Sequence, residues 1–310
     1  MRILVTGGAG FIGSHVVDAY VAAGHDVAVV DNLVNGRREN LNPEAAFYEV
    51  DIRDAGALDE VFEREQPEVV NHHAAQIDVR RSVTEPIYDA EVNVLGALNV
   101  LEGARRYDAE QVIFISSAAV YGMPVYLPID EEHPIRPLSP YGASKYAIET
   151  YLNVYRETHG LRTTVFRYAN VYGPRQDPYG EAGVVAIFVS RMLDPEGPPP
   201  VINGSGEQTR DFVYVGDCAR ANVMALTQET SGVYNLGTGE ETSVNELAAA
   251  IQALTGYPGE IAHGPAKAGD VARHYADASR AEAALGWRAE VDLRTGLAET
   301  VAYFEAKGRK

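Results

Sequence analysis

The first 31 residues constrain the fold of this chain most strongly, because they change from the pattern of a strand to a glycine turn, a helix and a second strand. Residues 3–5 form an apolar run, and Gly7, Gly8, Gly10 and Gly13 follow at the spacings GxGxxG and GxxGxxG. Such a turn lets the backbone approach a pyrophosphate, and the N-terminus of the following helix presents N–H groups and a positive dipole to it. The stretch therefore predicts a dinucleotide site at the first strand-to-helix turn.

A carboxylate at the end of the second strand indicates which dinucleotide is preferred. Asp31 stands where a ribose-binding acid follows the glycine turn in nucleotide-binding units. A carboxylate accepts hydrogen bonds from both ribose hydroxyls of NAD, but it repels the additional phosphate of NADP. We therefore expect NAD, and the alternative interpretation of Asp31 is a solvated residue at the end of a strand.

The composition excludes several classes of function. The 310-residue chain has a net charge of -18 and 46% hydrophobic residues, which is ordinary for a globular protein and unfavourable for nonspecific binding to nucleic acid or anionic membranes. An anionic substrate therefore requires a locally basic pocket. The single cysteine, Cys218, excludes an internal disulfide and fits a reducing compartment. Because no apolar run is long enough to span a membrane and no signal peptide precedes the first strand, we expect a cytoplasmic protein.

Strands and helices alternate through the first half of the chain, which predicts an α/β fold with a Rossmann-type doubly wound parallel sheet. We expect an NAD-binding domain over residues 1–168, with segments near residues 209–236 returning to it. Residues 169–310 are expected to form mainly a smaller, mixed α/β substrate domain. Between residues 31 and 168 the predicted strands are 47–50, 68–71, 111–116 and 163–167, and the predicted helices are 55–65, 84–107 and 141–159.

A tyrosine and a lysine four residues apart, Tyr141 and Lys145, begin the helix predicted at 141–159. Residues with this spacing lie on one face of a helix. An ammonium group within a few ångströms favours the phenolate and lowers the pKa of a phenol from its usual value of about 10. The preceding strand ends in Ser116 and Ser117, so that a hydroxyl can reach a substrate oxygen beside the phenol. Together with the glycine turn these residues predict acid–base chemistry, whereas the pair alone would also fit an exposed helix surface.

Eleven sequence blocks resemble, in the same order, those of the extended short-chain dehydrogenase/reductases, and most closely those of the UDP-glucose 4-epimerase family. The blocks are TGGAGFIGS, DNL, VDIRD, HHAAQIDVRRS, EVNVLGALNVLE, ISSAAVYG, YGASK, RYANVYGPRQDP, TRDFVYVGDCARA, YNLGTG and AGDVARHYAD. The resemblance extends over nearly the whole chain.

The resemblance implies roles for the residues at matching positions. The implied catalytic triad is Ser117, Tyr141 and Lys145. The implied NAD-binding residues are Gly7, Gly10, Phe11, Ile12, Asp31, Asn32, Asp51, Ile52, Ala74, Asn93 and Lys145. The implied residues on the side of the substrate, a UDP-hexose, are Ser117, Tyr141, Asn170, Arg210, Lys267 and Asp270.

Side-chain chemistry fits some of these roles and limits others. Asp51 can accept a hydrogen bond from an adenine amino group, although a turn residue is an alternative. Asn93 stands among apolar neighbours, where an amide braces the backbone of a bent helix more often than it touches a ligand. Arg210 can clamp a diphosphate through two donors, with a surface ion pair to Asp211 as the alternative. We expect no metal site, because the adjacent His72 and His73 point to opposite sides of a strand and no acidic or cysteine cluster accompanies them.

Two alanines indicate which reaction of this superfamily the chain catalyses. Ala118 and Ala119 stand where nucleotide-sugar dehydratases carry an acidic pair, and alanine has no proton to transfer. The resemblance then implies an NAD-dependent isomerase that interconverts UDP-glucose and UDP-galactose by oxidation at C4, rotation of the 4-keto intermediate and reduction on its other face. The alternatives are an epimerase of N-acetylhexosamine or uronate UDP-sugars, a nucleotide-sugar reductase or dehydratase, and a non-enzymatic protein that senses a dinucleotide.

Three positions near the expected substrate depart from the family pattern or vary within it. Lys267 replaces a diphosphate-binding arginine and would act as a point charge, and Phe212 replaces a tyrosine. His274 occupies a variable position, where its size favours UDP-glucose and UDP-galactose over N-acetylhexosamines. The resemblance also implies a homodimer, in which the helices predicted at 84–107 and 141–159 pair across a two-fold axis.

Overall fold

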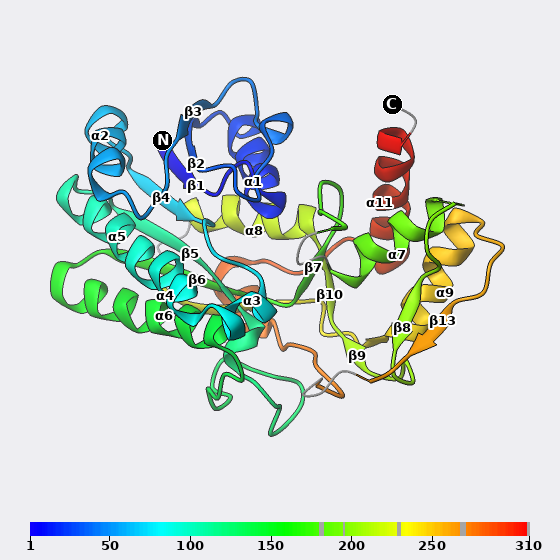
Figure 1. Cartoon of the computed structure of the whole chain (residues 1–310). Coiled ribbons are helices and arrows are strands. Elements are labelled where there is room, and N and C mark those ends of the chain that lie inside the picture. The colour runs from blue at the N-terminus through cyan, green and yellow to red at the C-terminus, as the bar shows by residue number, and fades with distance from the viewer. Residues whose placement is uncertain (180–182, 195, 228–230, 267–270, 309–310) are drawn as a thin grey trace.

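A seven-stranded parallel sheet forms the centre of the computed structural model, which describes residues 1–179, 183–194, 196–227, 231–266 and 271–308 (Figure 1). The strand order is β11-β6-β5-β4-β1-β2-β3. The strands are β1 (Arg2–Thr6), β2 (Asp26–Asp31), β3 (Ala46–Glu49), β4 (Val69–His72), β5 (Gln111–Ser117), β6 (Arg162–Tyr168) and β11 (Gly232–Leu236). All sheet pairs are parallel, so their carboxyl ends share one edge and the predicted Rossmann-type α/β fold is confirmed.

Helices cover both faces of this sheet, because successive side chains of a buried strand point to opposite sides. Ile3 and Val5 of β1 belong to one apolar core, and Leu4 belongs to the other. The first core includes side chains of α1 (Phe11–Ala22), α8 (Val215–Thr227) and α10 (Ser279–Leu285). The second core includes side chains of α2 (Ala55–Glu65), α5 (Ala97–Arg106) and α6 (Pro140–His159).

The helix predicted over residues 84–107 is confirmed in its main part, because α4 (Pro86–Ala90), a π-helical turn η2 (Glu91–Gly96) and α5 follow one another without a gap. Its start was predicted two residues too early, since Thr84 ends a separate short helix, α3 (Val79–Thr84). Glu85 has non-helical dihedral angles, and Pro86 starts α4, where its missing N–H leaves no intrahelical bond unmade. Gly96 lies so close to Ile52 that a side chain on it would collide with that residue. The helix therefore opens where its inner face meets the loop after β3.

The C-terminal half contains short strands and three packed helices. β10 (Phe212–Tyr214) pairs with β7 (Asn170–Tyr172), β9 (Thr209–Arg210) with β12 (Thr242–Ser243), and β8 (Val201–Asn203) with β13 (Ala262–Gly264). Helices α7 (Val184–Leu193), α9 (Val244–Thr255) and α11 (Leu293–Gly308) share a third apolar core with these strands. Within residues 209–236, β11 pairs with β6 of the main sheet and α8 packs against α1. The division of the chain after residue 168 stays a prediction.

The described residues also form two short 3-10 helices. They are η1 (Arg38–Asn40), in the loop after β2, and η3 (Ala118–Val120), directly after β5. Among the described residues, no helix is long and apolar enough to cross a membrane.

Candidate active site

The glycine turn lies between β1 and α1, at the carboxyl edge of the sheet. Gly7 has a φ of +73°, and a Cβ on it would lie 2.6 Å from the backbone nitrogen of Ala74. A Cβ on Gly13 would overlap the carbonyl oxygen of Gly7. Gly10 precedes α1 without a side-chain cap, so the first N–H groups of this helix remain directed at the turn. Phe11 and Ile12 follow at the start of α1, where they are half-buried.

Asp31 holds the glycine turn in place. The side chain is 7% exposed and accepts hydrogen bonds from the backbone N–H groups of Ala9, at 3.0 Å, and Leu33, at 2.8 Å. The carbonyl oxygen of Ala9 in turn accepts from the Arg37 N–H at 2.9 Å and from the Asn40 amide at 3.0 Å. Burial raises the pKa of Asp31, and the two N–H donors oppose this shift. The carboxylate therefore organises the turn in addition to its predicted ribose contact.

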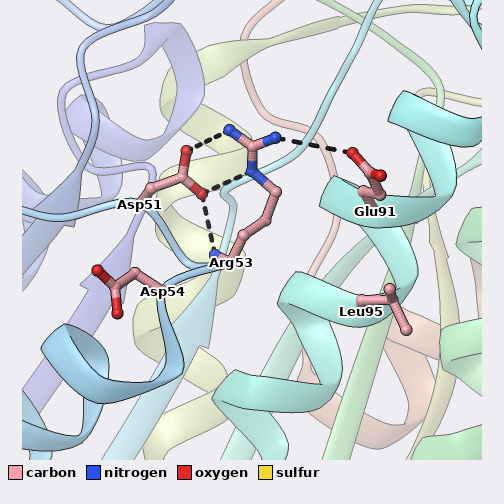
Figure 2. A pocket seen from close by; sticks show the side chains of 5 residues that line it. All are labelled: Asp51, Arg53, Asp54, Glu91 and Leu95. Carbon is pink, nitrogen blue, oxygen red and sulfur yellow. Dashed lines mark hydrogen bonds and ion pairs between the residues drawn. The ribbon is translucent and has the colours of Figure 1, made fainter.

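Asp51 lies in a cavity of about 470 Å³ with a mainly acidic lining, which Figure 2 shows and which we term the acidic cavity. Its lining residues are Asp51, Arg53, Asp54, Glu91 and Leu95. The Asp51 carboxylate accepts from the backbone N–H, Nε and Nη2 of Arg53 and from the amide of Asn32, at 2.7 to 3.0 Å. The Arg53 guanidinium holds the pKa of Asp51 well below its usual range. Because these four donors fill the lone pairs of the carboxylate, an adenine amino group can reach Asp51 only by displacing one of them.

Ala74 and the two histidines follow the carboxyl end of β4. The Ala74 N–H donates to the hydroxyl of Thr6 at 3.3 Å, and the same hydroxyl lies 2.6 Å from Nδ1 of His72. Burial and the Lys145 ammonium lower the pKa of His72 and of His73 to about 3, which keeps both rings neutral. Within the described part of the chain no group of three or more His, Cys, Asp or Glu residues could hold a metal ion.

Asn93 connects the π-helical turn to the loop after β4. Its side chain accepts from the Gln76 N–H at 2.7 Å and donates to the Gln76 carbonyl oxygen at 2.9 Å. It also donates to Asp89 at 3.0 Å and to the Ser144 hydroxyl at 3.2 Å. These contacts agree with the expectation that the amide braces backbone, and they tie the loop to the helix that carries Lys145.

The three predicted catalytic residues lie on β5 and at the start of α6, two elements that pack together. Ser117 is the last residue of β5 and is half-buried, and its hydroxyl accepts from the Ala119 N–H at 3.2 Å. Tyr141 is half-buried in the first turn of α6. One turn later, Lys145 lies with its Nζ 5.9 Å from the centre of the Tyr141 ring and donates to the Ile115 carbonyl oxygen at 2.8 Å. The arrangement places the Lys145 ammonium group near the phenol of Tyr141 and binds it to the strand that ends in Ser117.

Lys145 carries its charge in a buried environment. The residue is 4% exposed, and burial lowers its pKa to about 8, against the opposing effect of Asp89 and Glu149. Its Nζ also lies 5.0 Å from the centre of the Phe114 ring, whose face attracts a cation. The two carboxylates therefore keep the ammonium group partly stabilised without a direct ion pair.

A buried ion pair beneath the catalytic residues was not predicted. Glu149, one turn after Lys145 on α6, accepts from Nε and Nη2 of Arg167 on β6 at 3.0 and 2.5 Å. Both side chains are at most 5% exposed, and Glu149 also accepts from the Ser116 hydroxyl at 2.5 Å. The pair therefore fixes the end of β5 against the helix that carries Tyr141. An acidic residue four positions after Lys145 was the only local signal, and its partner is distant in the sequence.

The residues predicted on the substrate side are less enclosed. Asn170 is exposed at the start of β7. Arg210 is half-buried, and its Nη1 donates at 2.7 Å to the carbonyl oxygens of Thr209 and Val271. The Asp211 carboxylate accepts instead from N–H groups of Thr238, Gly239 and Ala276 and from the Thr238 hydroxyl. Lys267 and Asp270 lie outside the described residues.

His274 is buried near this region. The side chain is 8% exposed, and burial, together with the Arg210 charge, lowers its pKa to about 4. Its Nδ1 is enclosed, and none of the described residues forms a hydrogen bond with it. A neutral ring with a buried, unused nitrogen stands at the position that was expected to limit the size of the sugar.

A second cavity, of about 540 Å³, lies between α3 and the C-terminal half, and we term it the arginine cavity. Its lining residues are Arg80 of α3, Val184, Ile187, Phe188 and Arg191 of α7, and Val201 and Asn203 of β8. Among the described residues that line it, two are arginines and none is a carboxylate. In a chain with a net charge of -18, such a lining favours an anionic ligand. The acidic composition implied that an anionic substrate needs a locally basic pocket, but it did not indicate which segments form this pocket.

The carboxyl edge of the sheet fits a dinucleotide. At Gly7 and Gly13 a side chain would collide with backbone, so the turn is kept open for a close approach. The uncapped start of α1 offers N–H donors to a pyrophosphate. The acid at the end of β2 lies beside this turn, as its hydrogen bond to Ala9 shows. These residues therefore suit NAD by their own chemistry.

Comparisons with known proteins agree with this geometry. The chain matches the model of the NAD dependent epimerase/dehydratase family over residues 3–237. It is 45% identical to the UDP-glucose 4-epimerase of Mycolicibacterium smegmatis, and the match covers 100% of both chains. The structure of UDP-glucose 4-epimerase from Thermotoga maritima with UDP-glucose has a TM-score of 0.96 and 48% identity, covering 99% of each chain. The Thermus thermophilus UDP-glucose 4-epimerase complex with NAD has a TM-score of 0.93 and 45% identity, over 98% of this chain and 99% of that one. These likenesses confirm the family that the sequence blocks indicated, and the chain belongs to the NAD dependent epimerase/dehydratase family.

Proposed function

We propose that this protein interconverts UDP-glucose and UDP-galactose, with NAD as a tightly bound cofactor. The observation that carries the proposal is the position of Lys145 one turn after Tyr141, with its Nζ 5.9 Å from the centre of the tyrosine ring, on a helix that packs against β5 and its last residue, Ser117. β5 is followed by η3, in which Ala118 and Ala119 offer no proton for elimination. The UDP-glucose in the Thermotoga relative and the NAD in the Thermus relative support this choice of substrate and cofactor.

NAD is held, in this proposal, by the turn around Gly7 and Gly10 and by residues at the ends of the following strands. Asp31 takes the ribose hydroxyls, and Asn32, Asp51 and Ile52 surround the adenine. The remaining residues assigned to the dinucleotide are Phe11, Ile12, Ala74, Asn93 and Lys145. When bound, NAD supplies an acceptor and donor of hydride at C4 of the sugar.

The residues of the chain move the proton that accompanies this hydride. Tyr141, as a phenolate, takes the proton of the C4 hydroxyl at its Oη, and Ser117 donates a hydrogen bond from its Oγ to the same sugar oxygen. Lys145 favours the phenolate through its charge. Tyr141 returns the proton when the keto group is reduced from the other face, so the enzyme ends each cycle in its starting protonation state.

The arginine cavity receives the nucleotide part of the substrate in this proposal. Its apolar wall on α7 suits the flat face of a uracil ring, and the amide of Asn203 can pair with polar groups at the edge of the ring. Asn170 and Arg210 are assigned to the path from the nucleotide to the sugar. The family resemblance assigns Lys267 and Asp270 to the same substrate. The sugar is UDP-glucose or UDP-galactose rather than an N-acetylhexosamine, because the bulk of His274 limits the space beside it.

The experiment that tests the function offers the purified protein a panel of UDP-sugars and separates the C4 epimers of each. The panel contains UDP-glucose, UDP-galactose, UDP-N-acetylglucosamine and UDP-glucuronate. We expect conversion of the two hexoses in both directions and slower conversion of the others. Loss of water from the product, or net consumption of added NADH, would show a dehydratase or a reductase instead.

Assembly as a homodimer and location in the cytoplasm are part of the same proposal. Val83, Ile87, Tyr146 and Val154 are exposed apolar side chains on α3, α4 and α6, which pack beside one another in Figure 1. A second copy that covers this face would form a bundle of helices across a two-fold axis. Light scattering after gel filtration should show a dimer, which Ile87→Glu converts to monomer and the distant Val34→Glu does not.

A further inference from the structure

Arg80 stands out as a cation on a rigid support. Its backbone N–H is fixed by the side chain of Asp78, which caps the start of α3 at 2.7 Å. Asp78 is fixed in turn by a hydrogen bond from its N–H to the Gln76 side chain at 2.6 Å, and Gln76 is tied to Asn93. The Arg80 side chain is exposed and lines the arginine cavity. Among the described residues, none binds its guanidinium by a hydrogen bond or an ion pair.

The neighbouring arginine on the same helix is held within the protein. Arg81 donates from Nε and Nη2 to Glu85 at 3.1 and 2.9 Å. Its guanidinium also lies 4.0 Å from the centre of the Tyr88 ring. The two adjacent arginines thus differ, because the Arg81 guanidinium binds Glu85 and Tyr88, whereas Arg80 lines a cavity.

The place of α3 determines which part of a nucleotide sugar Arg80 would meet. α3 packs against α6, the helix that carries Tyr141. Arg80 of α3 also lines the arginine cavity, together with residues of α7 and β8. A nucleotide sugar whose base lies against α7 and whose C4 reaches Tyr141 has its diphosphate between these two positions.

From this position we propose that Arg80 binds the diphosphate of the nucleotide sugar and positions it for reaction at C4. The inference rests on the proposed function and deepens it. Arg191, which donates at 3.3 Å to the Pro199 carbonyl oxygen, lines the same cavity and adds a second positive charge. A guanidinium can grip two phosphate oxygens at once, which the ammonium group of Lys267 cannot do.

The test compares Arg80→Ala with Arg81→Ala, two variants that remove the same charge from neighbouring positions of one helix. Calorimetric titration with UDP, UMP and uridine measures binding to the NAD-loaded protein without any turnover. We expect Arg80→Ala to weaken the binding of UDP roughly 10- to 100-fold, as for the loss of a charge-assisted hydrogen-bonded pair. The affinity for uridine should stay unchanged, because uridine has no phosphate. Arg81→Ala should change UDP binding less than about twofold, as for an exposed ion pair. Arg80→Lys should recover part of the affinity, because it restores the charge but not the fork.

The kinetic counterpart is a rise in KM for UDP-galactose in Arg80→Ala that exceeds any fall in kcat. An equal loss of UDP affinity in both alanine variants would overturn the proposal, since it would reflect only the overall positive charge of α3. A loss of affinity for UDP-glucuronate without a loss of affinity for UDP would also overturn it, because Arg80 would then bind the carboxylate of the sugar. If the wild type binds UDP but epimerises no UDP-sugar, the proposed function fails while the calorimetric test of Arg80 remains decisive.

Discussion

The acidic cavity and the arginine cavity differ in the charge of their linings and in how far their charged groups are bonded to one another. In the acidic cavity, Arg53 joins Asp51 to Glu91, so its charged groups are bonded to one another before any ligand is present (Figure 2). In the arginine cavity, Arg80 and Arg191 face a space that no carboxylate lines within the described residues. The charges of the acidic cavity are thus largely paired within the protein, whereas the positive charges of the arginine cavity favour a bound anion.

This difference matches the different fates of the two ligands in the proposed reaction. An acidic lining repels phosphate and suits the amino group and hydroxyls of an adenosine, and its fixed side chains favour a cofactor that stays. A cationic and partly solvated lining attracts a diphosphate and allows it to leave after each cycle. The molecule therefore separates a permanent ligand from an exchanging one by charge and by order.

The largest expected effect comes from the phenol that stands where the two ligands meet. Tyr141→Phe removes the proton acceptor and should lower kcat by roughly a factor of 10² to 10⁴, which is the usual contribution of general acid–base catalysis. NAD content should stay at the wild-type level, because the ring and Lys145 remain. The control is Tyr146→Phe, which removes an exposed phenol from the same helix. Near-normal turnover in Tyr141→Phe would contradict the assignment of Tyr141.

Removing one partner of the buried ion pair Glu149–Arg167 tests whether the region around Tyr141 and Lys145 is ordered by the protein itself. Arg167→Met leaves Glu149 buried without its partner, which should lower the free energy of unfolding by about 3 to 5 kcal/mol. The double variant Glu149→Gln/Arg167→Met carries no stranded charge and should recover most of this loss. Chemical denaturation of all three proteins measures the effect. An unfolding free energy of Arg167→Met equal to that of the wild type would show that the pair adds nothing to the order of this region.

Lys145 should impose a pH dependence on activity. Its pKa of about 8 in the folded protein means that kcat falls by roughly tenfold per pH unit above that value, as the ammonium group beside Tyr141 is lost. The effect on stability has the opposite sign. Because the folded pKa is below the usual value of 10.5, the unfolded chain binds more protons between about pH 8 and 10.5, and the unfolding free energy from this residue rises with pH in that range. Denaturation of NAD-free wild type and Lys145→Met across this range measures the contribution, because the difference between their unfolding free energies removes the opposite effect of buried Cys218 and the buried tyrosines. We expect this difference to rise with pH in favour of the wild type.

The smallest expected effect concerns the choice between NAD and NADP. Asp31→Asn removes the negative charge that opposes the additional phosphate of NADP, and it should reduce the preference for NAD about tenfold. The control is Asp26→Asn, at the exposed start of the same strand. Competition between the two cofactors for NAD-free protein measures the preference. An unchanged preference in Asp31→Asn would assign discrimination to another residue.

Local sequence patterns predicted the parts of the site that are close in the chain. Glycine spacing placed the turn before α1, and the separation of Tyr141 and Lys145 placed both on one face of α6. Pro86 also marks the start of the long helix, because proline favours the first helical position, but the helix was predicted to begin two residues earlier.

Local sequence patterns did not predict contacts between segments that are distant in the sequence. Ser116 and Glu149 are 33 residues apart, and Glu149 meets Arg167 only because α6 packs on the sheet. The arginine cavity joins α3 to α7 and β8, which no spacing rule connects. The π-helical turn follows from the close approach of Gly96 to Ile52, which is a tertiary contact.

The central claim is that NAD stays bound while the sugar exchanges, and one measurement tests it most directly. Protein is passed through gel filtration without added cofactor, assayed with UDP-galactose, filtered again, and its NAD content is measured before and after. We predict near-stoichiometric NAD in both samples and many turnovers to UDP-glucose without any supplement. Turnover that requires added NAD, or NAD that appears in the small-molecule fractions after the assay, would contradict the claim.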